Sequence, residues 1–536
     1  MRKRTVFIGL DGATFTILDP MMNKGVMPFL KDFLKSGARA ELRSVIPPLT
    51  PPAWTSLVTG RSPGHHGIFD FFLREENSPH LRFATSKDVR CETIWSIAGQ
   101  NGLRVTTLNF PLMLPPPKLN GYVVAGGWMT PRQLPLGCYP DTLYPRIRAI
   151  PGFDPHNLAM KMAHEEKVLE GCTRDEYEDW IRMHIIREHQ WFNILNYVMH
   201  EEPCDLTAIL FDGVDKIQHL CWRFFAPDYT NEILMPWEQQ VQDLCHEYFS
   251  NLDRLLAKIV SLSGPNSTIV IASDHGFGAQ TETFFVNEWL NREGYLFWVD
   301  SNHPRDSEAA VLGMGQLARH VYMLDWTKTT AYASTPSSNG IHIVRASGES
   351  DHGIAETEYD GFRKKLMDSL YTVANPATGT RVMERIWTRE EVFDGPYAGY
   401  APDLTLSLRD GGLISILGSD SPVKLRDKPS GTHRPHGVFM AKGPGIQSGV
   451  TSGELSILDV APILLYSLGL PIPKEMEGCI PEEVFCRAFM KEYPVHFAEY
   501  PRSEKVSRQD TKVNLLFDAE AETEMAARLR ALGYIE

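Results

Sequence analysis

Short apolar runs alternate with amphipathic, helix-like segments along much of this chain. Five runs have the length and composition of buried strands: Val6–Leu10, Val105–Leu108, Tyr122–Ala125, Leu206–Phe211 and Thr268–Ala272. After the first run, a segment that opens at Pro28 carries Phe and Leu at helical spacing, and Gly37 is placed to terminate it. Such alternation is typical of βαβ units. The pattern therefore predicts an α/β fold with a mainly parallel central sheet flanked by helices.

Two stretches interrupt the alternation, so we expect a core built in three parts. The first stretch is Pro-rich and then strongly helical, and its main helix opens with Thr173 and Glu176, which fit a capping box. The second is polar, with strand-like pieces at Thr330–Ser334 and Gly340–Val344. Insertions over the carboxyl edge of a sheet commonly shape substrate pockets. The expected division is core at 1–127, 204–301 and 376–492, insertions at 128–203 and 302–375, and a tail at 493–536 with a helical pattern at 521–535.

Composition and charge narrow the range of functions and compartments. The formal net charge of -14 argues against binding to nucleic-acid polymers, because phosphate backbones require clustered Lys and Arg. No apolar stretch approaches the ~18 residues that a membrane span requires. The eight cysteines are scattered without a C-x-x-C pair, which favours free thiols in a reducing compartment. We therefore expect a cytoplasmic protein without a membrane association.

Acidic and histidine residues follow several of the apolar runs. They are Asp11, Asp215, His219, Asp274, His275 and, in the segment SGTHRPHGVFMAKGP, His433. Open α/β sheets bind their ligands at the carboxyl ends of the strands, where these side chains would meet. Three carboxylates and three imidazoles suit Zn²⁺ or Mn²⁺ better than the all-oxygen coordination of Ca²⁺ or Mg²⁺. The pattern suggests a two-metal hydrolytic site.

Each of these residues also has a structural interpretation. Asp11 precedes a glycine, and Asp-Gly is a common turn pair. Asp215 and His219 have i, i+4 spacing, so they would face one metal on a helix, but surface helices carry such pairs as well. Asp212 competes with Asp215, although it fits the strand-to-turn junction better, and His436 competes with His433. Asp274-His275 is more specific, because consecutive Asp and His at a strand end rarely serve packing.

Thr50 is the candidate nucleophile, in the segment VIPPLTPPAWTSLVTG. Two prolines that suit a first helical turn follow it, and Gly60 suits a helix end, so this segment alone favours a helix cap. The functional alternative places the hydroxyl at a helix N-terminus, where backbone N–H groups and the helix dipole favour anions. A hydroxyl that coordinates a divalent cation there would ionise near neutral pH and attack phosphorus.

The order of the motifs resembles the alkaline phosphatase superfamily, and within it the type I phosphodiesterase/nucleotide pyrophosphatase branch. The motifs are Asp11-Gly12, Val45–Gly60 with Thr50, TG-x-x-P-x-x-HGI at Thr59–Ile68, D-x-x-x-H at Asp215–His219, SDHG at Ser273–Gly276 and G-x-H at Gly431–His433. The segment Ile457–Ile480 also looks like the last helix and turn of that superfamily. The similarity extends from about Val6 to Gly478 and implies an alkaline-phosphatase-like three-layer sandwich with cap insertions.

The resemblance also implies a role for each motif. Asp11, Thr50, Asp274 and His275 would hold the metal that activates the nucleophile, and Asp215, His219 and His433 would hold a second metal beside the leaving oxygen. His433 is preferred to His436 because the family ligand follows a Gly-x pair. Thr50 would form a covalent intermediate with phosphorus, and the ions would most readily be zinc, with manganese as the alternative. The substrate would be a small phosphate ester.

The chain departs from the family pattern at one place that matters for substrate contacts. Related secreted phosphodiesterases carry an Asn soon after HGI, whereas this chain reads HGIFDFFLREEN, with Asn109 as a conceivable substitute. The substrate-binding residues and the oligomeric state are therefore left open. A sulfatase is disfavoured because Thr50-Pro51-Pro52 lacks the C/S-x-P-x-R motif. The remaining alternatives are a phosphomonoesterase, a phosphomutase, and a non-catalytic binding protein that retains the fold.

Overall fold

The centre of the molecule is a ten-stranded, mainly parallel sheet. The computed structural model describes residues 4–74, 81–126, 132–158, 173–229, 233–299, 323–346 and 352–500. The strand order is β18-β2-β17-β9-β1-β8-β5-β6-β7, and β19 pairs with β2 beside this path. The strands are β1 (Arg4–Leu10), β2 (Ala38–Arg43), β5 (Val105–Leu108), β6 (Gly121–Val124), β7 (Cys138–Tyr139), β8 (Leu206–Phe211), β9 (Ser267–Ala272), β17 (His436–Lys442), β18 (Val450–Thr451) and β19 (Leu455–Ser456).

The five strands in the middle of the sheet, β9-β1-β8-β5-β6, run parallel. Every residue of β8 and β9 is buried, which explains why these strands read as continuous apolar runs rather than as alternating patterns. Leu10 lies opposite Phe211, and Gly9 lies opposite Ala272, so β1, β8 and β9 end at the same edge. The residues that follow these strands are therefore brought together.

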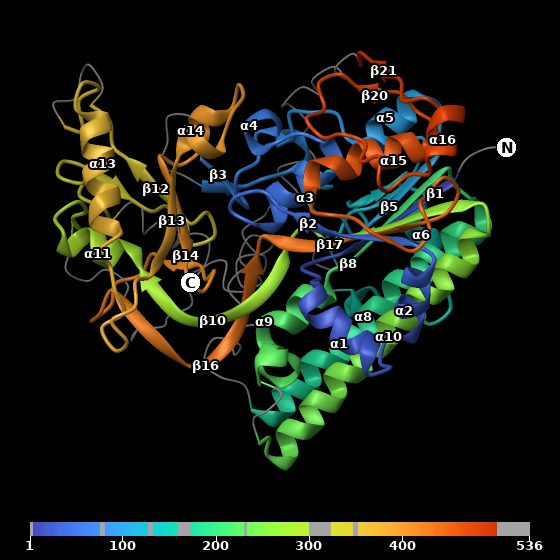
Figure 1. Cartoon of the computed structure of the whole chain (residues 1–536), viewed down its shortest axis with the longest axis horizontal. Helices are drawn as coiled ribbons and strands as arrows, with labels where there is room; N and C mark the ends of the chain where they lie inside the picture. The colour runs from blue at the N-terminus through green and yellow to red at the C-terminus, as the bar shows by residue number, and fades with distance from the viewer. Residues whose placement is uncertain are drawn as a thin grey trace.

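Helices cover both faces of the sheet, which makes a three-layer sandwich (Figure 1). One face carries α1 (Phe15–Asn23), α2 (Pro28–Lys35), α8 (Arg174–Glu201), α9 (Gly213–Phe225) and α10 (Pro236–Ser263). The other carries α3 (Thr50–Thr59), α5 (Ile94–Gln100), α15 (Val460–Leu468) and α16 (Arg487–Glu492). The predicted fold class, a mainly parallel central sheet between helical layers, is confirmed.

A smaller lobe lies beyond the carboxyl edge and has its own hydrophobic core. A long antiparallel ribbon of β10 (Gly276–Phe285) and β16 (Val423–Arg434) leads into this lobe, and β15 (Ile414–Ser415) pairs with β10. Its other elements include β3 (Phe72–Arg74), β4 (Leu81–Phe83), β11 (Ala331–Tyr332), β12 (Gly340–Ile343), β13 (Met383–Thr388), β14 (Leu404–Leu408), α11 (Val286–Arg292), α13 (Tyr359–Leu370) and α14 (Arg389–Val392). This core draws on residues from several separated parts of the chain.

Local sequence predictions can be compared with the elements directly. Helix α2 begins at Pro28 as predicted but ends at Lys35, two residues before Gly37. The capping box of α8 is confirmed, because Glu176 accepts hydrogen bonds from the Thr173 backbone N–H and hydroxyl at 2.8 and 2.9 Å. The helical pattern at 521–535 lies outside the described residues. The division into core parts and insertions stays a prediction.

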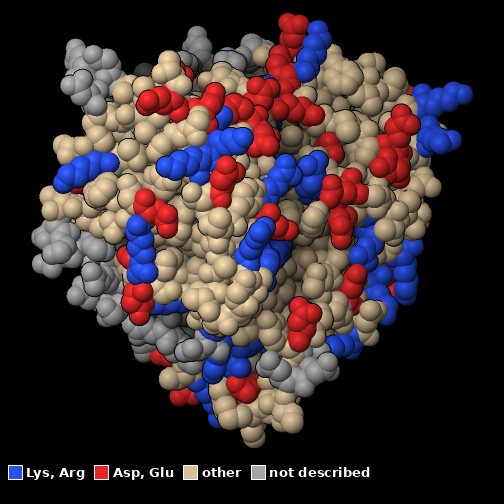
Figure 2. All heavy atoms as spheres, turned by 60° about the vertical axis from the view of Figure 1, so that its left-hand side comes forward, with Lys and Arg blue, Asp and Glu red and all other residues tan. Residues whose placement is uncertain are grey.

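Surface charge, cysteine pairing and helix apolarity are the remaining general features of the described residues. On the face drawn in Figure 2, Lys and Arg are interspersed with Asp and Glu over the described residues. The seven cysteines in the described ranges are free: Cys91, Cys138, Cys204, Cys221, Cys245, Cys479 and Cys486. None of the helices within those ranges combines the length and apolarity that a bilayer crossing needs.

Candidate active site

The ends of β1 and β9 place two carboxylates and an imidazole side by side. Asp11 directly follows β1, and Asp274 and His275 follow β9 after Ser273. The backbone N–H of Gly12 donates to Asp274 Oδ1 at 3.1 Å, which joins the two loops. His275 Nε2 lies 3.3 Å from Asp274 Oδ2 and 3.6 Å from Asp11 Oδ1. All three side chains are buried.

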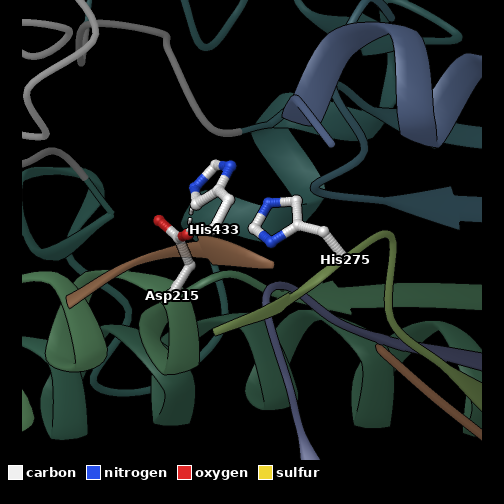
Figure 3. Close-up of side chains that lie close together, drawn as sticks. All are labelled: Asp215, His275 and His433. Carbon is white, nitrogen blue, oxygen red and sulfur yellow. Dashed lines mark ion pairs between the residues drawn. The ribbon is translucent and has the colours of Figure 1, made fainter. Parts of the chain in front are cut away.

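Helix α9 and strand β16 supply a second group of side chains. Asp215 and His219 stand one turn apart on α9, and His219 Nε2 lies 3.4 Å from Asp215 Oδ1. His433 reaches the same oxygen from β16, with Nε2 at 3.2 Å. His433 lies within a strand, not in a loop, and pairs with Phe277 of β10. Figure 3 shows Asp215 and His433 in contact, with the ring of His275 beside them.

The rings of His275 and His433 join the two groups. Their centroids are 3.5 Å apart and the rings are stacked. Two sets of potential ligand atoms result: Asp11, Asp274 and His275 form one set, and Asp215, His275 and His433 form the other. Because His275 belongs to both sets, the two candidate metal positions adjoin.

Thr50 lies at this junction as the first residue of α3. Its Oγ is 3.4 Å from His275 Nε2, and its side chain is buried. The helix cap that the segment favoured is instead Leu49, so the Thr50 hydroxyl does not cap α3. Gly60 ends the helix in the left-handed conformation, as predicted. Pro51 and Pro52 have no N–H, and the Ala53 N–H donates to the Leu49 carbonyl, so among the first three residues of α3 only Thr50 has a backbone N–H and the expected row of donors is reduced to one.

Backbone carbonyl groups set the orientation of the three imidazoles. The Nδ1 atoms of His219, His275 and His433 lie 3.0, 3.1 and 2.7 Å from the carbonyl oxygens of Gly431, Gly276 and Pro48. A carbonyl oxygen can only accept, so Nδ1 carries the proton in each neutral ring. The Nε2 lone pairs then face the carboxylates. This is the arrangement found where histidine binds a metal.

Several buried atoms lack the hydrogen bonds that burial normally demands. Within the described residues, no hydrogen bond reaches Asp11 Oδ1, Asp215 Oδ1 or Asp274 Oδ2. His219 Nε2 and His433 Nε2 face one another at 3.2 Å, although both carry lone pairs in the neutral rings. Buried polar atoms without partners are costly, and a cation near them would satisfy all of these groups at once. The donor set of imidazole nitrogens and carboxylate oxygens fits a divalent metal.

Burial and neighbouring charges shift the pKa values of the three carboxyl groups of the site. Burial, followed by the charges of Asp274 and Asp215, raises the pKa of Asp11 well above its ordinary value. Burial is also the main cause that raises the pKa of Asp274. Burial acts in the same direction on Asp215, but electrostatic attraction from His219 and His433, whose Nε2 atoms lie 3.4 and 3.2 Å from its Oδ1, brings its pKa well below the usual range. The cluster thus concentrates negative charge where little water can solvate it.

The competing residues have other partners. Asp212 forms buried ion pairs with Arg187 and Lys216, with Lys216 Nζ at 3.1 Å. His436 is about half exposed, with its Nε2 2.9 Å from Glu454 Oε2.

The site also depends on two residues that the sequence analysis does not name as site residues. Gln218 Nε2 donates to the Gly12 carbonyl at 2.8 Å, and Ser273 Oγ donates to the Ala13 carbonyl at 2.9 Å. Both hold the loop after β1; Gln218 lies within the D-x-x-x-H motif and Ser273 within SDHG, but neither motif identifies the distant partner.

Asn109, the possible substitute for the missing family Asn, and Asp70, two residues after the HGI segment, both form hydrogen bonds within the protein. Asn109 Nδ2 donates to the Leu210 carbonyl at 2.8 Å and to Asp212 Oδ1 at 3.2 Å. Asp70, which follows HGI, accepts hydrogen bonds from Thr335 and Ser337 of the smaller lobe, each at 2.6 Å. These contacts hold both side chains within the protein.

Comparison with known protein families identifies the class of enzyme to which this fold and this cluster of side chains belong. The chain matches the family model described as type I phosphodiesterase / nucleotide pyrophosphatase over residues 5–437. The chain therefore belongs to the type I phosphodiesterase/nucleotide pyrophosphatase family, and it is a hydrolase of phosphoester bonds. The family resemblance predicted from the motifs is confirmed.

Solved structures with similar folds include two kinds of hydrolase. Murine ectonucleotide pyrophosphatase/phosphodiesterase 5, an inactive variant in complex with AMP, is 13% identical, with 87% of this chain and 95% of that chain covered at a TM-score of 0.48. Its human counterpart is 14% identical, with 92% and 99% covered at a TM-score of 0.49. Phosphonoacetate hydrolase from Sinorhizobium meliloti, in complex with phosphonoformate, is 16% identical, with 87% and 95% covered at 0.48. Among curated proteins, the sequence search found no match.

Proposed function

We propose that this chain hydrolyses phosphodiester or pyrophosphate bonds in a small phosphate ester, with Thr50 as the nucleophile and two divalent metal ions. The observation that carries the proposal is the position of the Thr50 hydroxyl. It lies 3.4 Å from His275 Nε2, and His275 also lies beside the buried carboxylates of Asp11 and Asp274. Metal-assisted phosphoryl transfer requires a nucleophile close to the ligands of the metal, and the Thr50 hydroxyl lies close to these candidate ligands.

Each ion would have its own set of residues. Asp11, Thr50, Asp274 and His275 would hold the first, and Asp215, His219 and His433 would hold the second. The Nε2 orientation of the three histidines supports this assignment, as do the carboxylate oxygens without hydrogen bonds. Nitrogen ligands combined with carboxylates favour zinc, with manganese as the alternative.

The chemistry proceeds in two displacements at phosphorus. Two divalent cations would supply a lower pKa for the nucleophilic hydroxyl and neutralisation of charge on the phosphate. The Thr50 Oγ loses its proton and bonds to phosphorus, while the bond from phosphorus to the leaving oxygen breaks and that oxygen takes up a proton. A water molecule then bonds to phosphorus and loses a proton, and the bond between phosphorus and Thr50 Oγ breaks. Thr50 is thereby regenerated.

Assays on paired substrates and a Thr50 variant test this proposal. We expect faster turnover of a bis-aryl phosphodiester than of the matching aryl monoester, with zinc or manganese added. Thr50→Ala should reduce turnover by roughly 10³-fold or more, because the covalent path loses its nucleophile, while elemental analysis still finds most of the metal.

Thr55→Ala is the matched control on the same helix. The Thr55 hydroxyl donates to the Pro51 carbonyl at 2.7 Å within α3, so its loss should leave turnover within about twofold. Retained activity in Thr50→Ala would contradict the nucleophile. Monoester turnover far above diester turnover would identify a phosphomonoesterase, and phosphoryl transfer back to the substrate would identify a mutase.

A further inference from the structure

Helix α8 from the Pro-rich, helical insertion presents buried charged residues to the start of α9. Arg187 and Glu188 of α8 are 1% and 3% exposed. Arg187 Nη1 donates to Asp212 Oδ1, and Asp212 is the residue that connects β8 to α9. Arg187 Nε donates to the Leu158 carbonyl at 2.9 Å, so the guanidinium is fixed on two sides. The Arg187 side chain of α8 is therefore bonded to Asp212, the residue at which α9 begins.

Other contacts hold the same turn of α9. The Gly213 N–H donates to Glu188 Oε1 at 2.9 Å, and the Tyr248 hydroxyl of α10 donates to that oxygen at 3.0 Å. Trp180 Nε1 of α8 donates to the Lys216 carbonyl at 3.3 Å. No space remains for a side chain at Gly213, because a Cβ added there would lie 2.4 Å from Glu188 Oε1. The first turn of α9 is thus fixed by both α8 and α10.

Two buried cations share the carboxylate of Asp212. Asp212 lies between Arg187 and Lys216, and the three residues are each less than 5% exposed. Removal of the Arg187 guanidinium would leave Asp212 paired with Lys216 at Oδ2, with the Asn109 amide 3.2 Å from Oδ1. The ion pair between Asp212 and α8 would then be lost, so α8 would no longer fix Asp212 and the turn that begins there.

We propose that Arg187 is a positioning residue for the second metal: through Asp212 it sets the N-terminal turn of α9, and thereby Asp215 and His219. This inference rests on the proposed function, because it takes Asp215 and His219 as ligands. Asp215 lies in the first turn of α9 and His219 one turn later, so a shift of this turn moves both side chains. Asp11, Asp274 and His275 come from strand ends and are not carried by α9. The helical insertion therefore acts on one metal position and not on the other.

Metal binding to the apoprotein tests the proposal without any activity assay. Zinc would be titrated into wild type, Arg187→Met and Arg187→Lys in the presence of a chromophoric chelator. Residues that orient metal ligands typically change metal affinity by about 10–100-fold. We expect Arg187→Met to weaken the second equivalent of zinc by that factor and the first by less than about threefold. Arg187→Lys keeps the charge and should recover part of the affinity.

Two further variants separate positioning from general destabilisation. Arg389→Met removes the guanidinium that donates to buried Asp403 at 2.6 Å in the smaller lobe, far from α9 in the fold, and should change neither zinc equivalent. Arg187→Met combined with Asp212→Asn and Lys216→Met removes all three buried charges, so it carries the test if the single variant does not fold, and it should weaken the second equivalent of zinc likewise. Equal weakening of both equivalents, or no weakening, would overturn the proposal. A wild-type protein that binds fewer than two equivalents would instead refute the proposed function.

Discussion

At the scale of single residues, main-chain carbonyls decide what the histidines of the site can do. Gly431, Gly276 and Pro48 each fix a proton on Nδ1, which turns Nε2 towards the carboxylates. Gly276 directly follows His275, but Gly431 and Pro48 are 212 and 385 positions from His219 and His433, so no local pattern specifies those two partners. The residue types could be predicted from the sequence because Asp and His after apolar strands are typical of ligand sites at the carboxyl edge of an α/β sheet. The tautomers of His219 and His433 could not, because these depend on contacts between distant segments.

Asp70 supplies a residue-scale prediction about pH. Burial raises its pKa to about 6, despite hydrogen bonds from Ser337 and Thr335. Because this pKa lies above that of the unfolded chain, the folded state holds the extra proton, and its stabilising effect is lost as the pH rises from about 4 to 6. The shift corresponds to about 3 kcal/mol. Relative to wild type, Asp70→Asn should therefore be more stable at pH 7 than at pH 4 by about that amount, measured by urea unfolding.

Asp88 provides a control of opposite sign. Burial would raise the pKa of Asp88, but the Arg82 guanidinium lowers it below its ordinary value. Asp88 therefore stabilises the fold at neutral pH and loses this contribution as the pH falls, so Asp88→Asn should lose more stability at pH 7 than at pH 4. The Asp70 prediction fails if the two variants show the same pH dependence.

At the scale of elements, strands with continuous apolar runs were predictable and the β10–β16 ribbon was not. The predicted bounds of Val105–Leu108 and Leu206–Phe211 agree with β5 and β8, because burial on both faces requires unbroken apolar sequence. The ribbon reads instead as Gly-rich and polar, GFGAQTETFF and VKLRDKPSGTHR. The ribbon contacts α9, and the pairing of its two strands contains a register shift between Gln280 and Glu282. No local sequence pattern reveals either feature.

The glycine two residues before His433 supports an element-scale prediction. A Cβ at Gly431 would lie 2.1 Å from the Gln218 carbonyl oxygen, at the point where β16 crosses α9. The Gly431 carbonyl also accepts from His219. Gly431→Ala should therefore push β16 away from α9, destabilise the fold by about 1–3 kcal/mol and weaken zinc binding at the second position. Thermal unfolding and zinc titration measure the two effects.

Gly453→Ala is the matched control for this change. A Cβ at Gly453 would have nothing within 4 Å, so this variant should keep both the stability and the metal affinity of wild type. If Gly431→Ala behaves like Gly453→Ala, the glycine of the G-x-H motif has no steric function.

At the scale of the whole molecule, the metals are expected to contribute to stability as well as to chemistry. Asp11 and Asp274 are both buried; burial raises the pKa of each, and the charge of Asp274 raises that of Asp11 further. A ligand that binds only the folded state stabilises it by about 4 kcal/mol when its free concentration is a thousandfold above Kd. Chelation should therefore lower the Tm, and zinc or manganese should restore it, as measured by calorimetry.

Asp11→Asn tests the cause of this effect. The substitution removes one of the two neighbouring carboxylates, so the apoprotein should have a higher Tm than wild-type apoprotein and gain less from added metal. An unchanged Tm of the wild type on chelation would show that the clusters bind no ion in the folded protein.

The central place of β1 in the sheet determines when the site comes into existence during folding. Strand β1 lies between β8 and β9, and its contacts with the ends of those strands join Gly12 to Asp274 across 262 positions of the chain. Contacts between such distant segments form only after large loops have closed. No partly folded chain that lacks the middle of this sheet holds both carboxylates together. Metal ions would thus bind only after the middle of the sheet has formed, and they would stabilise the folded protein rather than initiate folding.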